Sequence, residues 1–424
     1  MMLKRIGGYL VIFCILGCTL TNAGCNTKKE GTARKLIVVT EASFRERVEE
    51  AADFMMNQNH NDKYKIQVDV LPEESIHREQ VIKKLQTQIM AGKGPDLYIL
   101  DSSMEYERPT GENLFKDPSK IMESGVLAPL DKYIEKDPYW KNSTYKKELL
   151  DAGQYSDRQY IIPFSCDYFI FAYPTSDEQI RGSNLKEWLQ QIEKTDNKEL
   201  QSKMMLSLMA GRWGVPAIDY ENKEILFSKD EVYDFSLSYL QLSKKRHKLP
   251  DSYKMSSTYD LADSGRSFSN DFQNKRFQFV PNLYGEKPAA VKSYGTVSMS
   301  SSYKDAAYQF LMLFLNDTIE TEMKKIDKDT RIKGYIDSYG IPVQEKAIQA
   351  KAKAEGLDKT VTEQVCKTFS EIEQAFFVTD TERNMYTSIE NLEFGKPKSD
   401  ALMKEDVKNL VETVWEEYSI RIKE

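Results

Sequence analysis

Carboxylate and hydroxyl side chains stand directly after two short apolar runs of this sequence, where they could bind a polar molecule. Glu41 and Ser43 follow the first run, and Asp101 and Ser102 follow the second. Such groups form the hydrogen bonds that hold hydroxyl or amine groups of a small ligand. Each also has a structural alternative, because Ser43 suits a helix N-cap and Asp101 with Ser102 suits a turn.

Sequence patterns of covalent or metal-assisted catalysis are missing. The sequence has no Gly-x-Ser-x-Gly, P-loop or paired-cysteine zinc pattern, and its 3 histidines lack metal-ligand spacing. Adjacent carboxylates occur at Glu49–Glu50 and Glu73–Glu74. Neighbouring residues on a helix point apart, whereas glycoside hydrolysis needs two carboxyl groups about 5–9 Å apart facing one bond. We therefore expect a binding protein rather than an enzyme, with no cofactor, catalytic residue or metal.

The elements that must position these polar groups alternate regularly. Strand-like and helix-like hydrophobic patterns follow one another, which predicts a parallel sheet covered by helices. Ligands of such sheets bind at the carboxyl ends of the strands, where Glu41 and Asp101 stand. The predicted strands are 35–40, 64–70 and 96–100, with helices at 44–57 and 75–90 between them.

The junction before the third predicted strand explains why two glycines, a proline and an aspartate occur together. Gly92 fits the left-handed residue that ends a helix. Gly94 and Pro95 reverse the chain, since proline cannot continue a helix and restricts the residue before it. Asp96 can then accept hydrogen bonds from nearby backbone amides as the chain enters the strand.

Composition indicates a soluble globular protein. The chain has 424 residues, of which 40% are hydrophobic and 29% charged, enough for two or three domains. Its net charge is −7, and acidic and basic residues are interspersed, so we expect no nucleic-acid partner. Cys166 and Cys366 have apolar neighbours and are expected to be small core residues, with a bridge between them left open.

The N-terminus has the pattern of an export signal. Lys4 and Arg5 precede a mostly apolar run at 6–20, which falls short of the ~18 uninterrupted apolar residues of a spanning helix. The following Ala-Gly-Cys resembles a bacterial lipobox, which implies acylation of Cys25 and, among its acyl chains, palmitate. Cys18 is an alternative lipidation site, and a plain signal peptide or N-terminal anchor is another. The predictions are a lipoprotein signal peptide at 1–24, a tether at 25–34, and a lipid-anchored location on the extracytoplasmic face of the cell membrane.

Six stretches resemble, in order, the extracellular solute-binding proteins of ABC importers, in the oligosaccharide-binding branch. The resemblance runs in patches and covers most of the chain after the tether. The stretches are AGKGPDLYILD (91–101), ESGVLAPLDKYI (123–134), RQYIIPFSCDYFIFAYP (158–174), AIDYENKEILFSKDEVYDFSLSYLQL (217–242), SMSSSYKDAAYQFLMLFLND (298–317) and GIPVQEKAI (340–348).

The resemblance implies an α/β fold of the two-lobe periplasmic-binding-protein type (type II). A ligand cleft lies between the lobes, and the chain crosses between them at several hinges. The implied boundaries are lobe 1 at 35–162 plus 295–335, lobe 2 at 167–294 plus 338–424, and hinges near 163–167, 294–295 and 336–340.

It also implies further ligand contacts. Asp167 lies in the first crossover, where the family often places a polar contact, although a buried hinge carboxylate is the alternative. Tyr168 faces either the cleft or the lobe core. Trp213, between an arginine and a glycine, is either a stacking platform for a sugar face or a packing residue. Tyr284 precedes the second crossover and is a candidate wall of the cleft.

The resemblance indicates a function in transport, although one segment of the sequence differs from the family pattern. Many sugar-binding members carry a glycine and a tryptophan before the second crossover, and NDFQNKRFQFVPNLYGEKPAAV has neither pattern here. We expect a monomeric, membrane-anchored solute-binding protein that delivers a small solute, with an oligosaccharide favoured, to ABC permease subunits by lobe closure. The alternatives are a polyamine or peptide as the solute, and a ligand-presenting sensor or adhesin of the same fold.

Overall fold

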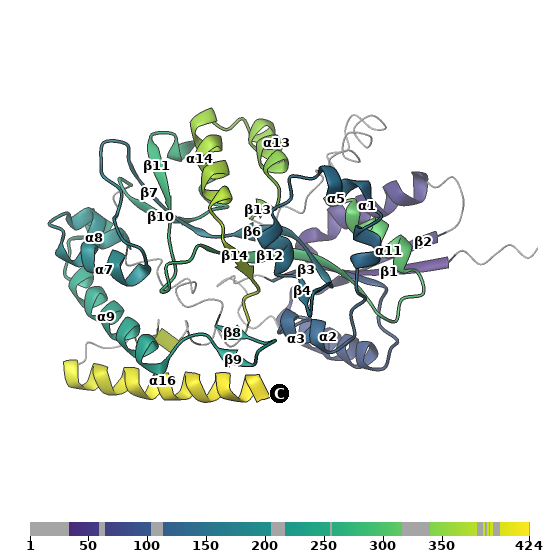
Figure 1. The fold of residues 1–424 in the computed structure, drawn as a ribbon, viewed down its shortest axis with the longest axis horizontal. Helices are drawn as coiled ribbons and strands as arrows, with labels where there is room; N and C mark the ends of the chain where they lie inside the picture. The colour runs from purple at the N-terminus through teal and green to yellow at the C-terminus, as the bar shows by residue number, and fades with distance from the viewer. Residues whose placement is uncertain are drawn as a thin grey trace, which may run out of the picture. The chain divides into compact units, whose positions relative to one another are not determined.

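Two β-sheets organise the protein, as the ribbon of this computed structural model shows (Figure 1). All described residues belong to one unit of the chain that begins at Arg34. The predicted signal peptide, Cys18, Cys25, Trp213 and nearly all of the third predicted hinge lie outside the described residues. The structure describes residues 34–58, 64–102, 113–204, 217–254, 257–315, 340–379, 385, 388–389, 391–392 and 399–423.

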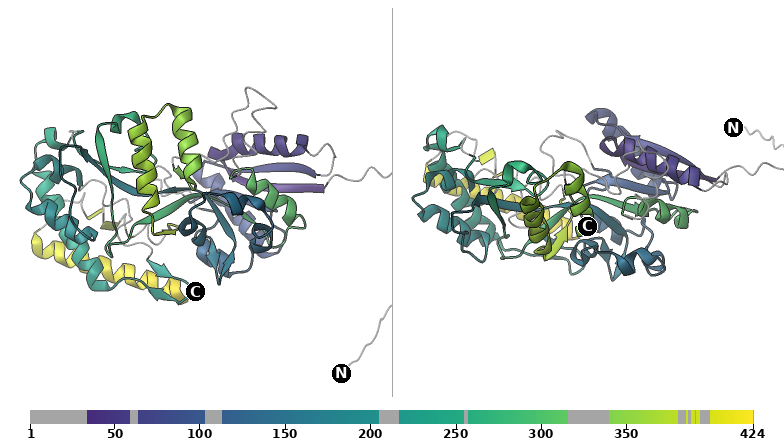
Figure 2. Two further views of the ribbon diagram at one scale, coloured as in Figure 1. Left: turned by 45° about the horizontal axis from the view of Figure 1, so that its top comes forward. Right: turned by 90° about the horizontal axis from the view of Figure 1, so that it is seen from above.

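The predicted strand–helix alternation at the start of the chain is confirmed. β1 pairs in parallel with β2 on one side and with β3 on the other. Helices α1 and α2 lie on opposite faces of this sheet (Figures 1 and 2). Val48 of α1 packs with Val38, and Ile82 of α2 packs with Val39. The elements are β1 (Arg34–Glu41), α1 (Arg45–Gln58), β2 (Tyr64–Leu71), α2 (Ser75–Met90) and β3 (Leu97–Asp101).

The junction between α2 and β3 has the predicted geometry. Gly92 follows the end of α2 with a φ of 66°, in the left-handed region that favours glycine. The Asp96 carboxylate accepts a hydrogen bond from the Ile37 amide at 2.8 Å and another from the Ser301 hydroxyl at 2.6 Å. This aspartate therefore fastens the start of β3 to β1 and to the segment after β12 (Pro288–Val297).

Two long strands, β6 (Ile161–Asp167) and β12, complete the larger sheet. They pair with each other in antiparallel fashion, and the register shifts on both sides of Ser293. The hydroxyls of Ser165 and Ser293 share a hydrogen bond of 2.6 Å at this irregularity. The predicted hinges at 163–167 and 294–295 thus fall inside paired strands. The seven-stranded sheet has the order β13 (Ile341–Pro342), β6, β12, β3, β1, β2, with β14 (Gln374–Phe376) paired to β12.

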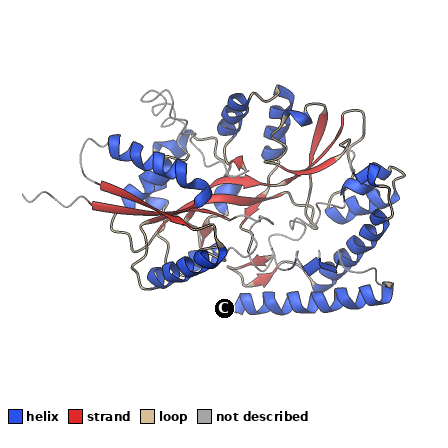
Figure 3. Ribbon diagram, turned by 180° about the vertical axis from the view of Figure 1, so that it is seen from behind, coloured by secondary structure: helices blue, strands red, loops and turns tan. Residues whose placement is uncertain are grey.

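A second sheet follows directly from β6, because only Tyr168 separates it from β7 (Phe169–Pro174). β7 is the central strand, antiparallel to β10 (Asp260–Asp263) and to β11 (Lys275–Phe279). Helix α14 (Lys359–Ser370) lies along the outer side of β11 (Figure 1). The last helix, α16 (Asp400–Lys423), runs alongside α9 (Lys229–His247) (Figure 3).

The other elements are short connections and covering helices. They are η1 (Ala42–Phe44), α3 (Pro118–Glu123), α4 (Asp131–Ile134), α5 (Pro138–Asn142), α6 (Lys147–Asp151), β4 (Gln154–Tyr155), β5 (Arg158–Gln159), α7 (Leu185–Lys194), α8 (Lys198–Met204), β8 (Ile218–Asp219), β9 (Glu224–Ile225), α10 (Asp251–Lys254), η2 (Asn270–Phe272), α11 (Lys304–Met312) and α13 (Glu345–Glu355). None of the helices in the described ranges combines the length and the apolar character needed to cross a membrane.

The two cysteines beyond the N-terminal region are core residues, as expected, and carry thiols rather than a disulfide. Cys166 is fully buried in β6, and Cys366 packs against the same hydrophobic core from α14. Burial, with the carboxylates of Glu345 and Glu363 nearby, raises the pKa of the Cys366 thiol to about 11. The thiol therefore stays protonated at neutral pH and reacts slowly as a nucleophile.

We predict that Gly295→Ala destabilises the protein by about 1–3 kcal/mol, because the core around β12 leaves no space for a methyl group. A Cβ at this position would lie 2.5 Å from the Phe164 ring and 2.6 Å from a Leu311 methyl group. Urea unfolding measures the change. Lys359→Ala, at an exposed position of α14, is the control and should change stability by less than about 0.5 kcal/mol. Equal stability of the two variants would contradict this account of the packing.

Candidate functional site

The carboxyl ends of β1 and β3 meet at one edge of the seven-stranded sheet. Glu41 ends β1 and Asp101 ends β3, and these strands are neighbours. β12 runs beside β3, where Ser293 faces Asp101 and the Ser102 amide donates a 2.8 Å hydrogen bond to the Lys292 carbonyl. This sheet edge consists of Glu41, Asp101, Ser102, Lys292 and Tyr294, and it is called the sheet-edge cluster below.

The Glu41 carboxylate binds an arginine side chain of the protein. Its two carboxylate oxygens accept hydrogen bonds of 2.8 and 2.9 Å from the Arg78 guanidinium of α2. The two side chains are only 1% and 2% exposed, so they form a buried ion pair. Ser43 is exposed in the turn η1, where Glu41 occupies the N-cap position without a capping side chain. The capping role expected for Ser43 is therefore not present at this turn.

The other predicted members of the cluster are buried as well. Asp101 is 5% exposed and Ser102 is 4% exposed, and the Ser102 hydroxyl donates to the Val291 carbonyl. Tyr294 is buried in the hydrophobic core that also includes Leu100 of β3. Burial raises the pKa of its phenol, and the carboxylates of Glu41 and Asp101 raise it further. The phenol therefore stays protonated, as a hydrogen-bond donor, over the physiological pH range.

The sequence analysis predicted neither Tyr294 nor Lys292 as a ligand contact, and the more unusual of the two is Lys292. Its side chain is only 8% exposed, yet its ammonium group makes no hydrogen bond or ion pair to the protein in the part that the structure describes. Its ammonium nitrogen is not among the enclosed polar atoms that lack a partner, so the stem of the side chain is buried while the ammonium group reaches the surface, where a ligand could meet it. The signal for it was a single lysine within the apolar run AAVKSYG of a strand.

Two predicted residues of the first crossover face inward. Asp167 is 2% exposed and accepts a 2.8 Å hydrogen bond from the Ser264 hydroxyl. Tyr168 is fully buried, and its ring stacks on Phe279 with 4.9 Å between centroids. Its hydroxyl shares a 3.1 Å hydrogen bond with Thr368, and burial raises the pKa of its phenol. The structure thus places Tyr168 in the core, the second of its two predicted environments.

Tyr284 lies apart from the sheet-edge cluster, in the loop between β11 and β12. It is 37% exposed, and its backbone amide donates a 2.9 Å hydrogen bond to the Asn282 side chain. Burial of the remaining surface raises the pKa of its phenol. Of the described residues predicted to bind ligand, the structure brings Glu41, Asp101 and Ser102 to one sheet edge and leaves Tyr168 and Tyr284 away from it.

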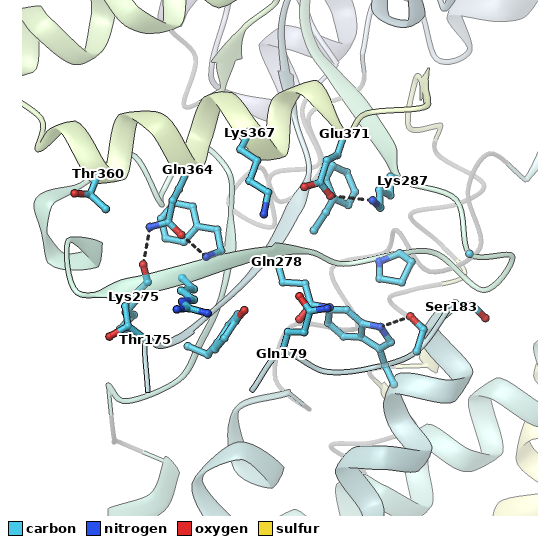
Figure 4. Close-up of a pocket in the computed structure, with 18 residues that line it drawn as sticks. Thr175, Gln179, Ser183, Lys275, Gln278, Lys287, Thr360, Gln364, Lys367 and Glu371 are labelled. Carbon is cyan, nitrogen blue, oxygen red and sulfur yellow. Dashed lines mark hydrogen bonds and ion pairs between the residues drawn. The ribbon is translucent and has the colours of Figure 1, made fainter. Parts of the chain in front are cut away.

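A pocket of about 620 Å³ lies on the smaller sheet, along the outer edge of β11 (Figure 4). It is named the β11 groove here, and all of its lining residues belong to the predicted second lobe. No described residues gather as a group of three or more side chains suited to bind a metal ion. The lining residues are Tyr173, Thr175, Gln179, Gly182, Ser183, Trp188, Lys275, Arg276, Phe277, Gln278, Phe279, Pro281, Gly285, Lys287, Thr360, Gln364, Lys367 and Glu371.

The ion pair at the sheet edge yields a test of stability. We predict that Arg78→Met destabilises the protein by about 3–5 kcal/mol, because it leaves the Glu41 carboxylate buried without its guanidinium. Replacing both partners, in Glu41→Gln with Arg78→Met, should cost clearly less than the single change. Urea unfolding of the four proteins of this double-mutant cycle measures the coupling. Additive effects would show that the pair contributes no interaction energy.

The family is shown by comparison with known proteins. The family model of bacterial extracellular solute-binding proteins matches residues 39–319. A search of curated protein sequences found no match. Similar solved structures include a family 1 extracellular solute-binding protein from Alicyclobacillus acidocaldarius, with 12% identity and a TM-score of 0.60 over 92% of this chain and 99% of that one.

Two further solved structures share the fold. The sugar-binding protein MalE of Xanthomonas citri has 13% identity and a TM-score of 0.59, and the match covers 92% of this chain and 100% of that one. A periplasmic oligogalacturonide-binding protein of Yersinia enterocolitica has 14% identity and a TM-score of 0.55, over 92% and 99%. They confirm the predicted two-lobe α/β fold of periplasmic binding proteins. This chain belongs to the family of bacterial extracellular solute-binding proteins.

Proposed function

We propose that the protein captures an oligosaccharide outside the cell and delivers it to the permease of an ABC transporter. The family accounts for binding of a small solute. The observation that carries the proposal is Lys292, a largely buried lysine at the carboxyl edge of β3 whose ammonium group has no partner within the described part of the protein. This edge is where α/β sheets bind their ligands, and a ligand oxygen would supply the missing hydrogen-bond acceptor.

The charges near this edge suit a ligand rich in hydroxyl groups. The two positive charges of Arg78 and Lys292 equal in number the two negative charges of Glu41 and Asp101, so these four side chains carry no net formal charge. A neutral polar surface made of carboxylate, ammonium and phenol groups can both donate to and accept from sugar hydroxyls. The similar structures include a sugar-binding and an oligogalacturonide-binding protein, which supports a saccharide as the solute.

Closure around the ligand would bend the two long strands. β6 and β12 link the seven-stranded sheet to the segments of the predicted second lobe, and their pairing is irregular around Ser293. Irregular pairing allows a local change of backbone angles between otherwise rigid bodies. The ligand favours the closed state only to the extent that it binds that state more tightly. The closed protein, a monomer held by acyl chains on Cys25, would then dock on the permease.

We predict that Lys292→Met separates binding from stability. Affinity for the bound oligosaccharide should fall about 10–100-fold, because a donor to the ligand is lost. Stability of the free protein should stay about the same, because no ion pair or hydrogen bond of the side chain within the described protein is lost. Calorimetric titration against a panel of oligosaccharides, peptides and polyamines, together with urea unfolding, measures both quantities.

Lys83→Met, at an exposed position of α2, is the matched control for this experiment and should change neither quantity. Binding of a polyamine but of no oligosaccharide in the panel would contradict the proposed solute. Unchanged affinity of the Lys292 variant would contradict the proposed place of binding.

The lipid anchor is tested by Cys25→Ser. The variant should move from the membrane fraction to the soluble fraction of its host, because multiple acyl chains on one residue hold the protein to the bilayer. Fractionation followed by immunoblotting measures the shift, with Cys18→Ser as the control. Loss of membrane association in the Cys18 variant alone would assign the acylation to that residue instead.

A further inference from the structure

Hydrogen bonds of two glutamine side chains hold the walls of the β11 groove in place. The Gln364 amide of α14 accepts a 2.7 Å hydrogen bond from the Phe277 N–H and donates one of 2.6 Å to the Lys275 carbonyl. The Gln278 amide bonds both to the Ile180 N–H, at 3.1 Å, and to the Ile180 carbonyl, at 2.7 Å. These bonds tie α14 and the loop before α7 to β11, so the groove is formed before any ligand arrives.

The lining of the groove is strongly cationic. Four basic side chains line it, against the single carboxylate of Glu371, in a protein whose net charge is −7. Helix α14 presents Thr360, Gln364 and Lys367 along one face, with Glu371 directly after its end, and Figure 4 shows the Lys367 side chain reaching from α14 toward β11. The basic residues are Lys275, Arg276, Lys287 and Lys367.

Two of these cations interact with other groups of the protein. Lys287 pairs with Glu371 at 2.9 Å, with both side chains about one-third exposed or less. Lys275 donates to the Ser257 carbonyl, and its ammonium lies 5.2 Å from the centre of the Phe272 ring. These interactions hold both ends of the groove in place.

The other two cations have no anionic partner. Neither Arg276 nor Lys367 forms an ion pair with a carboxylate of the protein in its described part. Arg276 forms a hydrogen bond with the Tyr173 hydroxyl. Because this hydroxyl is neutral, it does not offset the charge of the guanidinium group. Like charges that line one pocket raise the local positive potential and attract anions.

We propose that the β11 groove is a second ligand site, which binds a small organic anion with at least two negatively charged groups, carboxylate or phosphate. One group would bind Arg276, whose planar guanidinium suits both chemistries, and the other Lys367. The volume of about 620 Å³ lies within the range of small-molecule sites. This site is lined only by residues of the predicted second lobe and is separate from the sheet-edge cluster, so it goes beyond solute capture in the cleft.

The test is calorimetric titration of the purified chain at low ionic strength with pyrophosphate, citrate and acetate. We expect pyrophosphate, citrate or both to bind with one equivalent, and acetate not to bind, because it has a single charge. Arg276→Gln and Lys367→Gln should each weaken binding at least about tenfold, and added salt should weaken it further. Binding of only one polyvalent probe assigns the site to phosphate or to carboxylate ligands.

Lys359→Gln is the matched control, because Lys359 lies on the same helix but is 88% exposed and pairs with Glu363 outside the groove. It should bind the probes like the unchanged protein. Absence of binding for both polyvalent probes, or equal affinity in all variants, would overturn the proposal. Far-ultraviolet circular dichroism and urea midpoints confirm that the variants fold, and oligosaccharide affinity should be the same in all of them.

Discussion

The antiparallel pairing of β6 and β12 is the constraint on which the rest of the structure depends. β12 pairs with β3 through its last five residues and with β14 through its first three, and β6 continues into β7 of the smaller sheet. The pair belongs to the larger sheet, and β6 continues through Tyr168 into the smaller one. The shared hydrogen bond of Ser165 and Ser293 sits where the pairing is irregular.

Charged side chains that bind a partner within the protein differ from those whose charge remains available to a ligand. Glu41 and Arg78 satisfy each other within the protein, and Asp167 is satisfied in part by Ser264. Lys292 has no such partner in the described chain although it is buried beside Ser102. Its ammonium group is therefore available to a ligand, which is why we place the ligand at this residue rather than at the ion pair.

The sequence was sufficient for the strand–helix alternation from β1 to β3 because its local signals agree with one another. Periodic apolar residues indicated β1, α1, β2, α2 and β3, and Gly92 and Asp96 indicated the junction before β3. The two-lobe architecture was available only from the resemblance, because the pairing of β6 with β12 joins segments more than a hundred residues apart. No local pattern reports such a contact.

Single site residues were harder to predict, since burial and partners depend on the tertiary structure. Glu41 was correctly placed at the sheet edge, but its bond to Arg78 has no sequence signal beyond one basic residue in the first turn of α2. Tyr168 stands between two strands in a mostly apolar segment, and only its stacking on Phe279 shows that it faces the core. Lys292 was overlooked because a lysine in a strand is usually solvated.

The central claim is that the solute binds at the sheet-edge cluster. A crystal structure of the protein with the oligosaccharide that it binds most tightly tests this claim most directly. Our account predicts a sugar oxygen within about 3 Å of the Lys292 ammonium group, with the Asp101 carboxylate facing the same sugar. An oligosaccharide bound in the β11 groove, with Lys292 still without a partner, would contradict it.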